Sequence, residues 1–382
     1  MRLRDCHNIQ DFRRLAKRRL PRPVFDYIDG GADDEVTLRR NVASFDDCDL
    51  VPNVLAGVAE IDMSVTVLGR KIAMPLMLSP TAMQRLFHWE GERAVARAVA
   101  PFDTYFGIST LGTVSIEEIG ASFAGPKLFQ LYVHRDQGLN RALVQRCKAA
   151  GFDAIALTVD TIVGGNRERD LVSGFTTPPK WTPRSLLSFA AHPGWTLNYL
   201  TRERFSLVNL RDYVTGGSSV AMGVAHYIDT MFDPAMDWAA AERIRADWGG
   251  PFALKGVMSV ADARRAVEIG ATAIYISNHG GRQLDGGRAP FDQIAEIRDA
   301  VGDKLEIICD GGIRRGTHVL KALSAGATAC SGGRLYLYAL AAGGEAGVAR
   351  ALGRLRDEIT RDMKLMGVTR VDQLGRENLR RR

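Results

Sequence analysis

The chain has 382 residues, of which 46% are hydrophobic and 25% are charged, and its formal net charge is +6. This composition is typical of a folded globular protein and excludes an intrinsically disordered chain. Basic residues are spread along the sequence, apart from Arg380, Arg381 and Arg382 at its end, so we expect no nucleic-acid partner.

Cysteine and histidine spacing argues against two further classes of protein. The five cysteines are an odd set without a CxxC spacing, which disfavours a disulfide framework or a zinc ribbon and fits a reducing cytoplasm. The seven histidines form no HExxH pair, so we expect no metal site. The sequence has neither a signal peptide nor an apolar run of membrane-spanning length, and we therefore expect a cytoplasmic protein.

The N-terminal residues predict a short helical segment. Residues 8–20 have helical character, and Pro21 and Pro23 interrupt it before an apolar stretch that contains Tyr27. Residues 29–35 then form a glycine-rich turn that leads into an acidic helix start. Before any resemblance is considered, the default interpretation of Tyr27 is a half-buried tyrosine whose hydroxyl is satisfied locally.

From residue 75 onward, short apolar runs alternate with helix-length amphipathic segments. Most neighbouring runs are separated by 20 to 35 residues, roughly the length of one crossover helix, and an eight-fold repeat of this kind closes as a (β/α)8 TIM barrel. The expected helices are residues 90–99, 136–150, 260–269, 292–300, 317–325 and 341–366. The expected strands are residues 76–78, 105–108, 128–131, 154–159, 252–254, 273–276, 306–309 and 329–331.

We therefore expect residues 1–382 to form a single α/β domain, with a barrel at about 75–366. Gly343, Gly344 and Gly347 resemble a dinucleotide fingerprint, but no strand leads directly into them, and we discount it.

A long insertion separates the fourth and fifth expected strands, at about residues 170–235. Between residues 180 and 211 it mixes aromatic and aliphatic side chains with an excess of arginine. This mixture suits a peripheral contact with an anionic membrane surface, and a lid or an oligomer contact explains it equally well.

Chargeable or glycine residues follow each expected strand at the same end, where a barrel of this kind places its active site. His279 and Arg282 follow the sixth strand beside a glycine pair, and together they suit an acidic substrate that must lose a proton. Two consecutive glycine-arginine loops, with Arg314 and Arg334, suit a phosphate. With Lys255, Gln130 and Thr158, they describe a site for a mononucleotide with a polar ring.

These residues resemble a known family, the FMN-dependent L-2-hydroxy acid dehydrogenases and oxidases, which include glycolate oxidase, lactate dehydrogenase and mandelate dehydrogenase. The resemblance runs from about residue 8 to residue 375. Its most specific motif is the string SNHGGRQLD at residues 277–285, supported by SPTAM at 79–83, FQLY at 129–132, LTVD at 157–160, LKG at 254–256 and DGGIRRG at 310–316.

The resemblance implies FMN as the cofactor and assigns roles to individual residues. His279 resembles the catalytic base, Asp160 the carboxylate that orients it, and Tyr132 the group that hydrogen-bonds the substrate oxygen. Lys255 resembles the cation beside the flavin pyrimidine. The substrate carboxylate is expected to bind Arg282, Arg167 and Tyr27, with Tyr132 completing the substrate contacts. Flavin-ring, ribityl and phosphate contacts are expected from Pro80, Thr81, Ala82, Ser109, Gln130, Thr158, Lys255, Ser277, Asp310, Gly311, Gly312, Arg314, Gly333 and Arg334.

Departures from the family pattern bear on the substrate and the acceptor. Leu111 stands where the glycolate oxidases share a tryptophan, which argues against a small acid such as glycolate, and no proline follows Thr161, which makes the placement of Arg167 less secure. The aromatic, basic insertion resembles that of membrane-associated relatives. We therefore expect oxidation of L-lactate or a larger 2-hydroxy acid, with a quinone or another respiratory electron acceptor, in a homotetramer at the inner face of the cell membrane. The alternatives are an oxidase that produces peroxide and a phosphate-binding barrel without redox chemistry.

Overall fold

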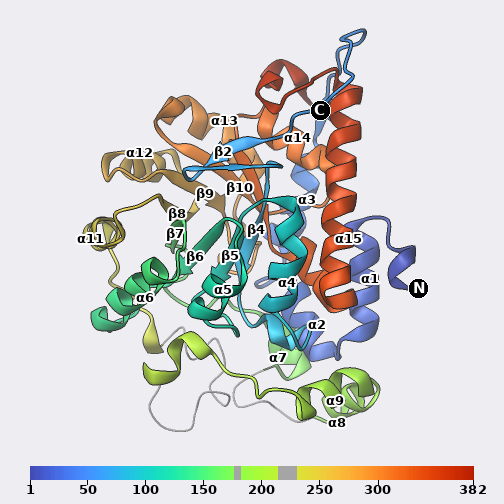
Figure 1. The fold of residues 1–382 in the computed structure, drawn as a ribbon, viewed down its shortest axis with the longest axis vertical. Helices are drawn as coiled ribbons and strands as arrows, with labels where there is room; N and C mark the ends of the chain where they lie inside the picture. The colour runs from blue at the N-terminus through green and yellow to red at the C-terminus, as the bar shows by residue number, and fades with distance from the viewer. Residues whose placement is uncertain (176–181, 214–229) are drawn as a thin grey trace.

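The computed structural model describes residues 1–175, 182–213 and 230–382, and its centre is a closed barrel of eight parallel strands (Figure 1). Each strand coincides with one of the eight apolar runs, so the predicted (β/α)8 barrel is confirmed. The strands follow one another around the barrel in chain order: β4 (Leu76–Thr81), β5 (Phe106–Ser109), β6 (Lys127–Leu131), β7 (Ala154–Thr158), β8 (Phe252–Val257), β9 (Ala273–Ser277), β10 (Glu306–Asp310) and β11 (Ala329–Gly332).

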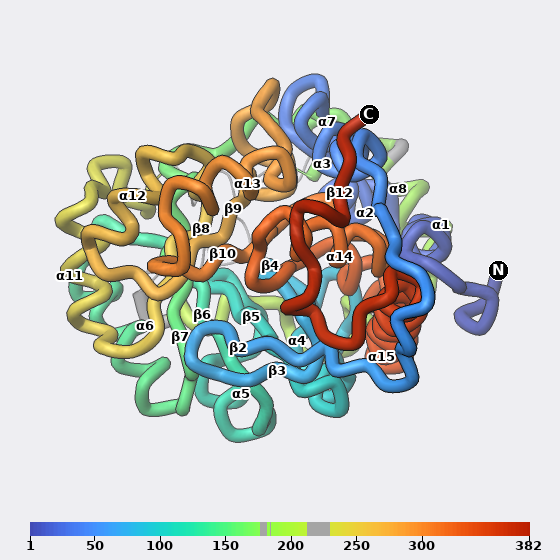
Figure 2. Tube along the Cα trace, turned by 90° about the horizontal axis from the view of Figure 1, so that it is seen from above, coloured from blue at the N-terminus to red at the C-terminus, as the bar shows by residue number. Residues whose placement is uncertain are grey.

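The strands are buried on both faces, which explains why the sequence shows continuous apolar runs and not alternation. One end of the barrel is covered by an antiparallel hairpin of β2 (Val65–Val67) and β3 (Arg70–Ile72) (Figures 1 and 2). The hydroxyl of Tyr105, inside the barrel, donates to the carbonyl of Leu68 at the hairpin turn, over 2.8 Å. We did not predict this hairpin, because its strands are only three residues long.

Helices surround the barrel in the order that the repeat predicts. The predicted helices are present, and α5 and α11 lie in segments that we had left without an assignment. The helices that follow the barrel strands are α4 (Glu92–Val99), α5 (Ile116–Ser122), α6 (Gln137–Ala149), α11 (Trp238–Trp248), α12 (Val260–Glu268), α13 (Pro290–Val301), α14 (Gly316–Ser324) and α15 (Arg334–Met366). Short 3-10 turns occur at Leu3–Asp5, Gln84–Leu86, Ala100–Phe102, Val208–Tyr213, Gly302–Lys304, Val371–Gln373 and Arg376–Asn378.

Helix α15 begins seven residues before the predicted start at Ala341. The backbone leaves helical geometry at Gly343 and Gly344, where φ of Gly344 is +57°. The glycine cluster therefore produces a kink between two helical halves, which agrees with our rejection of a dinucleotide fingerprint there.

The N-terminal segment folds as three helices, α1 (Ile9–Arg19), α2 (Arg22–Asp29) and α3 (Val36–Asp46). Helix α1 packs along α15 (Figure 1). Strand β1 (Cys48–Leu50) pairs antiparallel with β12 (Leu379–Arg381), which attaches the end of the chain to its N-terminal region.

The insertion between β7 and β8 contains α7 (Glu168–Ser173), α8 (Pro183–Ala190) and α9 (Pro193–Thr201). Pro183 and Pro193 occupy first-turn positions, where proline costs no hydrogen bond, so each proline starts a helix and together they prevent one continuous helix. Lys180 and Trp181, part of the predicted surface segment, lie outside the described residues. Within the described ranges, no helix is both long and apolar enough to cross a membrane.

A close backbone contact between β4 and β5 gives a test of this packing. A Cβ atom added at Gly107 would lie 2.6 Å from the nitrogen of Pro80 and 2.9 Å from the carbonyl oxygen of Leu78. We expect Gly107→Ala to lower the free energy of unfolding by about 1–3 kcal/mol, measured by urea denaturation, because backbone atoms must shift. Gly353→Ala, in α15 with open space around it, is the matched control and should stabilise by about 0.5–1 kcal/mol. Equal stability of the two variants would contradict the packing.

Candidate active site

A cavity with an empty volume of about 1010 Å³, open to solvent on one side, lies at the carboxyl end of the barrel strands. Four predicted site residues, Gln130, Thr158, Asp160 and Ser277, lie directly behind the side chains that line it. The other predicted residues line it: Tyr27, Pro80, Thr81, Ala82, Ser109, Tyr132, Arg167, Lys255, His279, Arg282, Asp310, Gly311, Gly312, Arg314, Gly333 and Arg334.

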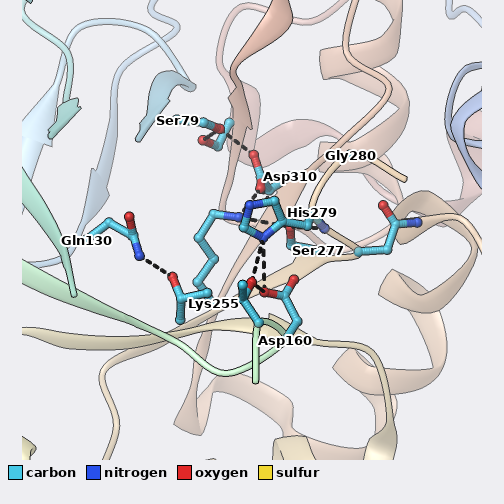
Figure 3. Close-up of polar contacts among 12 residues, drawn as sticks. Ser79, Gln130, Asp160, Lys255, Ser277, His279, Gly280 and Asp310 are labelled. Atoms are coloured by element: carbon cyan, nitrogen blue, oxygen red, sulfur yellow. Dashed lines mark hydrogen bonds and ion pairs between the residues drawn. The ribbon is translucent and has the colours of Figure 1, made fainter. Parts of the chain in front are cut away.

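His279 follows β9 in the left-handed region, with φ of +57°, and the next two glycines also have positive φ. The ring of His279 lies beside Asp160 and Lys255 (Figure 3). Its Nδ1 lies 3.0 Å from Oδ1 of Asp160 and 3.3 Å from Oγ1 of Thr161. Because a carboxylate only accepts hydrogen bonds, Nδ1 carries the proton, and Nε2, which is 3.5 Å from the Tyr132 hydroxyl, keeps its lone pair.

The surroundings of His279 favour a neutral imidazole that can accept a proton. Burial lowers the pKa of His279 below its ordinary value, although the Asp160 carboxylate partly opposes this shift. Burial raises the pKa of Asp160, but the positive charge that His279 carries when protonated, the His279 hydrogen bond and the Lys255 charge outweigh it, and the net shift is downward. Oδ2 of Asp160 is buried without a hydrogen-bond partner among the described residues. Asp160 is thus an ionised group able to stabilise a proton on His279.

Lys255 forms a buried ion pair with Asp310, with 2.9 Å between Nζ and Oδ2 (Figure 3). Ser277 bridges the two residues, since its hydroxyl accepts from Lys255 and donates to Asp310. Burial alone lowers the pKa of Lys255, but the Asp310 and Asp160 carboxylates reverse this and the net shift is upward. Lys255 therefore stays protonated and presents a fixed positive charge to the cavity.

A hydrogen-bonded chain of uncharged side chains runs along β5, β6 and β7, and its last member, Thr158, is the register neighbour of Lys255 on β8. Ser109 donates to Oε1 of Gln130 over 2.8 Å, and Nε2 of Gln130 donates to the hydroxyl of Thr158 over 2.7 Å. These two bonds fix the orientation of the Gln130 amide, with its oxygen toward Ser109 and its nitrogen toward Thr158. The chain holds Ser109 at the wall of the cavity and leaves Gln130 behind it.

Arginine side chains converge at the mouth of the cavity and donate to backbone carbonyls of the N-terminal segment. Arg334 donates to the carbonyls of Ile28 and Gly30 over 2.7 and 2.6 Å, and Arg282 donates to the carbonyl of Tyr27. Burial, together with the charge of Arg167, lowers the pKa of Arg282 to about 10. Burial also lowers the pKa of Arg314 and Arg334. Within the described chain no carboxylate forms an ion pair with any of these arginines, so the mouth favours anionic ligands.

Asp29, the last residue of α2, fixes the position of the helix end whose carbonyls accept from the arginines. It lies within 2.9 Å of a guanidinium nitrogen of Arg13 and of Arg169, and it accepts from the Tyr338 hydroxyl over 2.8 Å. Burial raises the pKa of Asp29, but these donors outweigh it and the pKa is about 2. The sequence showed Asp29 only as the first residue of a turn, because its partners lie 16, 140 and 309 residues away.

Two polar side chains of the site, Ser79 and Thr161, were not predicted. Ser79 donates to Asp310, and Thr161 donates to Asp160 over 3.0 Å. Phe87 and Leu111 form apolar parts of the cavity wall. Ser79 is the first residue of the motif at 79–83, and Thr161 directly follows the motif at 157–160. Their proximity to these motifs indicated a position near the site, but the sequence spacing did not identify their hydrogen-bond partners.

The comparisons with known proteins agree with this arrangement. A family model described as FMN-dependent dehydrogenase matches residues 16–381, and the chain belongs to this family. L-lactate oxidase of a Nostoc species is 42% identical, with 96% of both chains covered. Glycolate oxidase 1 of Oryza sativa subsp. indica is 38% identical over 98% of this chain and 96% of its own. The crystal structure of the monotopic membrane protein (S)-mandelate dehydrogenase superposes with a TM-score of 0.94, at 32% identity, covering 99% of this chain and 100% of its own.

The cavity fits FMN, the cofactor of the family. Arg314 and Arg334 and the glycines near them would hold the phosphate, because guanidinium groups without ion pairs need an anionic partner there. The ring would lie between Lys255 and the wall formed by Pro80, Thr81 and Ala82. When bound, FMN accepts the two electrons that a 2-hydroxy acid loses on oxidation. Family membership also excludes the alternative of a barrel without redox chemistry.

The Asp29 contacts predict a specific loss of stability. The downward pKa shift of this carboxyl, to about 2, corresponds to about 2 kcal/mol of stabilisation at neutral pH. We expect Asp29→Asn to lose about this amount in urea denaturation at pH 7, and the difference from wild type to shrink as pH falls toward 2. Asp26→Asn is the control, because burial raises the pKa of Asp26 and its charge does not stabilise the fold. Equal losses in both variants would contradict the role of Asp29.

The pKa of His279 predicts the pH dependence of substrate oxidation. Proton acceptance needs the neutral imidazole, so the rate of anaerobic flavin reduction should fall as pH drops through a pKa below about 6.5. Asp160→Asn should move this inflection to lower pH, because the carboxylate raises the pKa of His279, and should slow the step by about 100-fold or more. Stopped-flow absorbance across pH 5–9 measures both effects. An unmoved inflection would exclude Asp160 as the partner of His279.

Proposed function

We propose that the enzyme oxidises an L-2-hydroxy acid, L-lactate or a larger relative, to the 2-oxo acid and passes the electrons to a respiratory acceptor such as a quinone. The observation that supports it best is the pairing, in one cavity, of a neutral His279 backed by Asp160 with Arg282. FMN-dependent oxidation of a 2-hydroxy acid follows from the family. The identity of the acid and of the acceptor is the proposal.

The cations at the mouth support binding of the substrate carboxylate. The guanidinium carbon of Arg282 lies 4.7 Å from the centre of the Tyr27 ring, and that of Arg167 lies 5.8 Å from it. Nε of Arg167 is buried without a hydrogen-bond partner among the described residues. In our proposal Arg282 and Arg167 bind the carboxylate with help from Tyr27, and the Tyr132 hydroxyl contacts the substrate oxygen. His279 then takes either the Cα proton or the hydroxyl proton.

The apolar wall supports an acid with a side chain. Leu111 is almost fully buried and contributes to the wall together with Phe87, whose ring stacks on Tyr27 at 6.2 Å. A methyl or larger group on the substrate would gain from burial against these side chains, by about 0.8 kcal/mol per methylene-sized group. Glycolate lacks such a group and would gain nothing from this wall.

The insertion supports a membrane-associated acceptor. The similarity to the mandelate dehydrogenase described as monotopic covers nearly all of both chains. Helices α8 and α9 lie at the end of the barrel opposite the β2–β3 hairpin (Figure 1) and expose leucines to solvent. A homotetramer at the inner face of the membrane is part of the same proposal.

Use of oxygen is the second candidate, and two of the similar proteins are named oxidases. An oxygen electrode with peroxide detection would separate the two candidates. Rapid turnover with a soluble quinone analogue and slow peroxide formation are expected from a dehydrogenase, and the reverse ratio would establish an oxidase.

The substrate proposal predicts a rank order of anaerobic flavin reduction. We expect L-lactate and larger L-2-hydroxy acids to bleach the flavin absorbance at lower concentration than glycolate, because of the Leu111 wall. The matched variant is Leu111→Trp. Its larger side chain should occupy the space next to this wall and shift the preference toward glycolate. A wild-type preference for glycolate would refute the assignment.

Removal of the base tests the role of His279. His279→Gln should still bind FMN and show its yellow colour, because the hydrogen bonds of the His279 side chain within the described chain go to Tyr132, Thr161 and Asp160 and not to the arginines proposed to bind the phosphate. Its flavin should be reduced by substrate at least about 100-fold more slowly than in the wild type. Normal bleaching of this variant would remove His279 from the proposed chemistry.

A further inference from the structure

A second cavity, with an empty volume of about 1160 Å³, lies between the end of α1, the loop after β4 and helix α9. Phe87 lines both this cavity and the active-site cavity, so the two adjoin at this side chain. The proposed chemistry makes no use of the second cavity. Its other lining residues are mainly basic and aromatic, and those used below are Arg18, Arg19, Trp89, Trp195, Tyr199 and Arg202.

Three basic residues of this cavity, Arg18, Arg19 and Arg202, have no acidic partner in the part of the chain that the structure describes. Arg18 and Arg19 lie in the last turn of α1, and Arg202 caps the end of α9. Among the described residues, none of the three forms an ion pair. The lining includes an acid, Glu203, but it is bound by Arg85 at 3.5 Å and by Arg93 at 2.9 Å. The cavity therefore carries an excess of positive charge that an anionic ligand would neutralise.

The walls of the cavity are rigid and aromatic. The rings of Trp195 and Tyr199 stack at 5.0 Å, and the guanidinium of Arg202 lies 4.6 Å from the centre of a Trp89 ring. Nε1 of Trp195 donates to the carbonyl of Leu86 over 2.7 Å, which fastens α9 to the loop after β4. Tryptophan and tyrosine are the residues that lie at the boundary between lipid and water.

Exposed leucines lie on α9, which contributes to the cavity lining, and on α8, which precedes it in the chain. Leu197 and Leu200 of α9 are 62% and 74% exposed, and Leu186 and Leu187 of α8 are 52% and 72% exposed. Large apolar side chains in such a group are costly in water and are favourable when buried against acyl chains. Unpaired arginines and aromatic side chains thus line the cavity, while the exposed leucines lie outside its lining, on α9 and on the neighbouring helix α8.

We infer that this cavity binds the phosphate headgroup of an anionic phospholipid while the leucines of α8 and α9 contact its acyl chains. Arg18, Arg19 and Arg202 surround the phosphate, and Trp89, Trp195 and Tyr199 lie at the level of the glycerol backbone. The inference deepens the proposed membrane contact and rests on it. It adds α1, which lies outside the insertion, to the lipid-binding surface.

Vesicle binding tests the inference with the FMN-loaded full chain. The cavity variant Arg18→Ser/Arg19→Ser/Arg202→Ser is compared with the control Arg141→Ser/Arg243→Ser/Arg264→Ser. The three control arginines are exposed, form no ion pair with any described residue, and lie on α6, α11 and α12, on the other side of the barrel (Figure 1). Sedimentation uses phosphatidylcholine vesicles with and without 30% phosphatidylglycerol, a ratio of about one anionic lipid in three. We expect wild type and the control to bind the anionic vesicles alike and the cavity variant to bind at least about 10-fold more weakly. Equal binding of both variants would overturn the inference.

Soluble probes separate a headgroup site from a general charge effect. Dihexanoyl phosphatidylglycerol below its micelle concentration should change tryptophan fluorescence saturably in the wild type, and the change should be lost in the cavity variant. Dihexanoyl phosphatidylcholine and inorganic phosphate should give no saturable change. An equal response to inorganic phosphate would identify a free-phosphate site, and an equal response to phosphatidylcholine would remove the need for negative charge; either result overturns the lipid assignment.

Two further measurements distinguish lipid binding from self-association of the chain and from failure of the proposed function. If sedimentation velocity shows that the cavity variant alone changes its oligomeric state, the surface is an interface between copies of this chain and the inference fails. Anaerobic flavin reduction by the hydroxy acid should be unchanged in both triple variants. If the hydroxy acid does not reduce the flavin of the wild-type protein, the proposed function is refuted. If it reduces the flavin normally but the wild-type protein does not bind the lipid, only this inference is refuted.

Discussion

The site depends on an imbalance of charge at the carboxyl end of the barrel. Arg282, Arg314 and Arg334 are brought together there, and their fixed partners are backbone carbonyls, not carboxylates. Carbonyl dipoles position a guanidinium but leave its net charge uncompensated. The cavity is therefore organised around anions that must come from outside the chain, namely a phosphate and a substrate carboxylate.

The N-terminal segment makes this arrangement possible. The last turn of α2 offers its carbonyls to two arginines that follow β9 and β11, and Asp29 holds that turn through Arg13, Arg169 and Tyr338. On one side of this turn, the charge of Asp29 is neutralised by Arg13 and Arg169. On the side that faces the cavity, the charges of Arg282 and Arg334 are not neutralised by a described carboxylate. The Lys255–Asp310 pair differs from these arginines, since the charge of Lys255 is compensated by a carboxylate that also lines the cavity.

Much of the fold could be predicted from the sequence because barrel strands are local and buried on both faces. Runs such as those at residues 154–159 and 273–276 contain enough apolar side chains to be recognised alone. The convergence of His279 and Asp160 followed from a general rule about strand ends, although 119 residues separate them. Asp29 could not be predicted in the same way, because its importance depends on partners that only the folded chain brings near. The β2–β3 hairpin could not be predicted because strands of three residues are too short to show a hydrophobic alternation. The early start of α15 could not be predicted because the apolar residues after Arg334 show no helical periodicity.

The most direct test of the charge imbalance compares FMN with riboflavin, which has the same ring but no phosphate. Isothermal titration of the apoprotein with each compound measures how much of the binding free energy the arginines at the cavity mouth supply. The account predicts that FMN binds at least about 100-fold more tightly, equivalent to about 2.7 kcal/mol, and that this advantage shrinks in Arg314→Met. Equal affinity for FMN and riboflavin would show that the arginines do not require an anion, and would contradict the account.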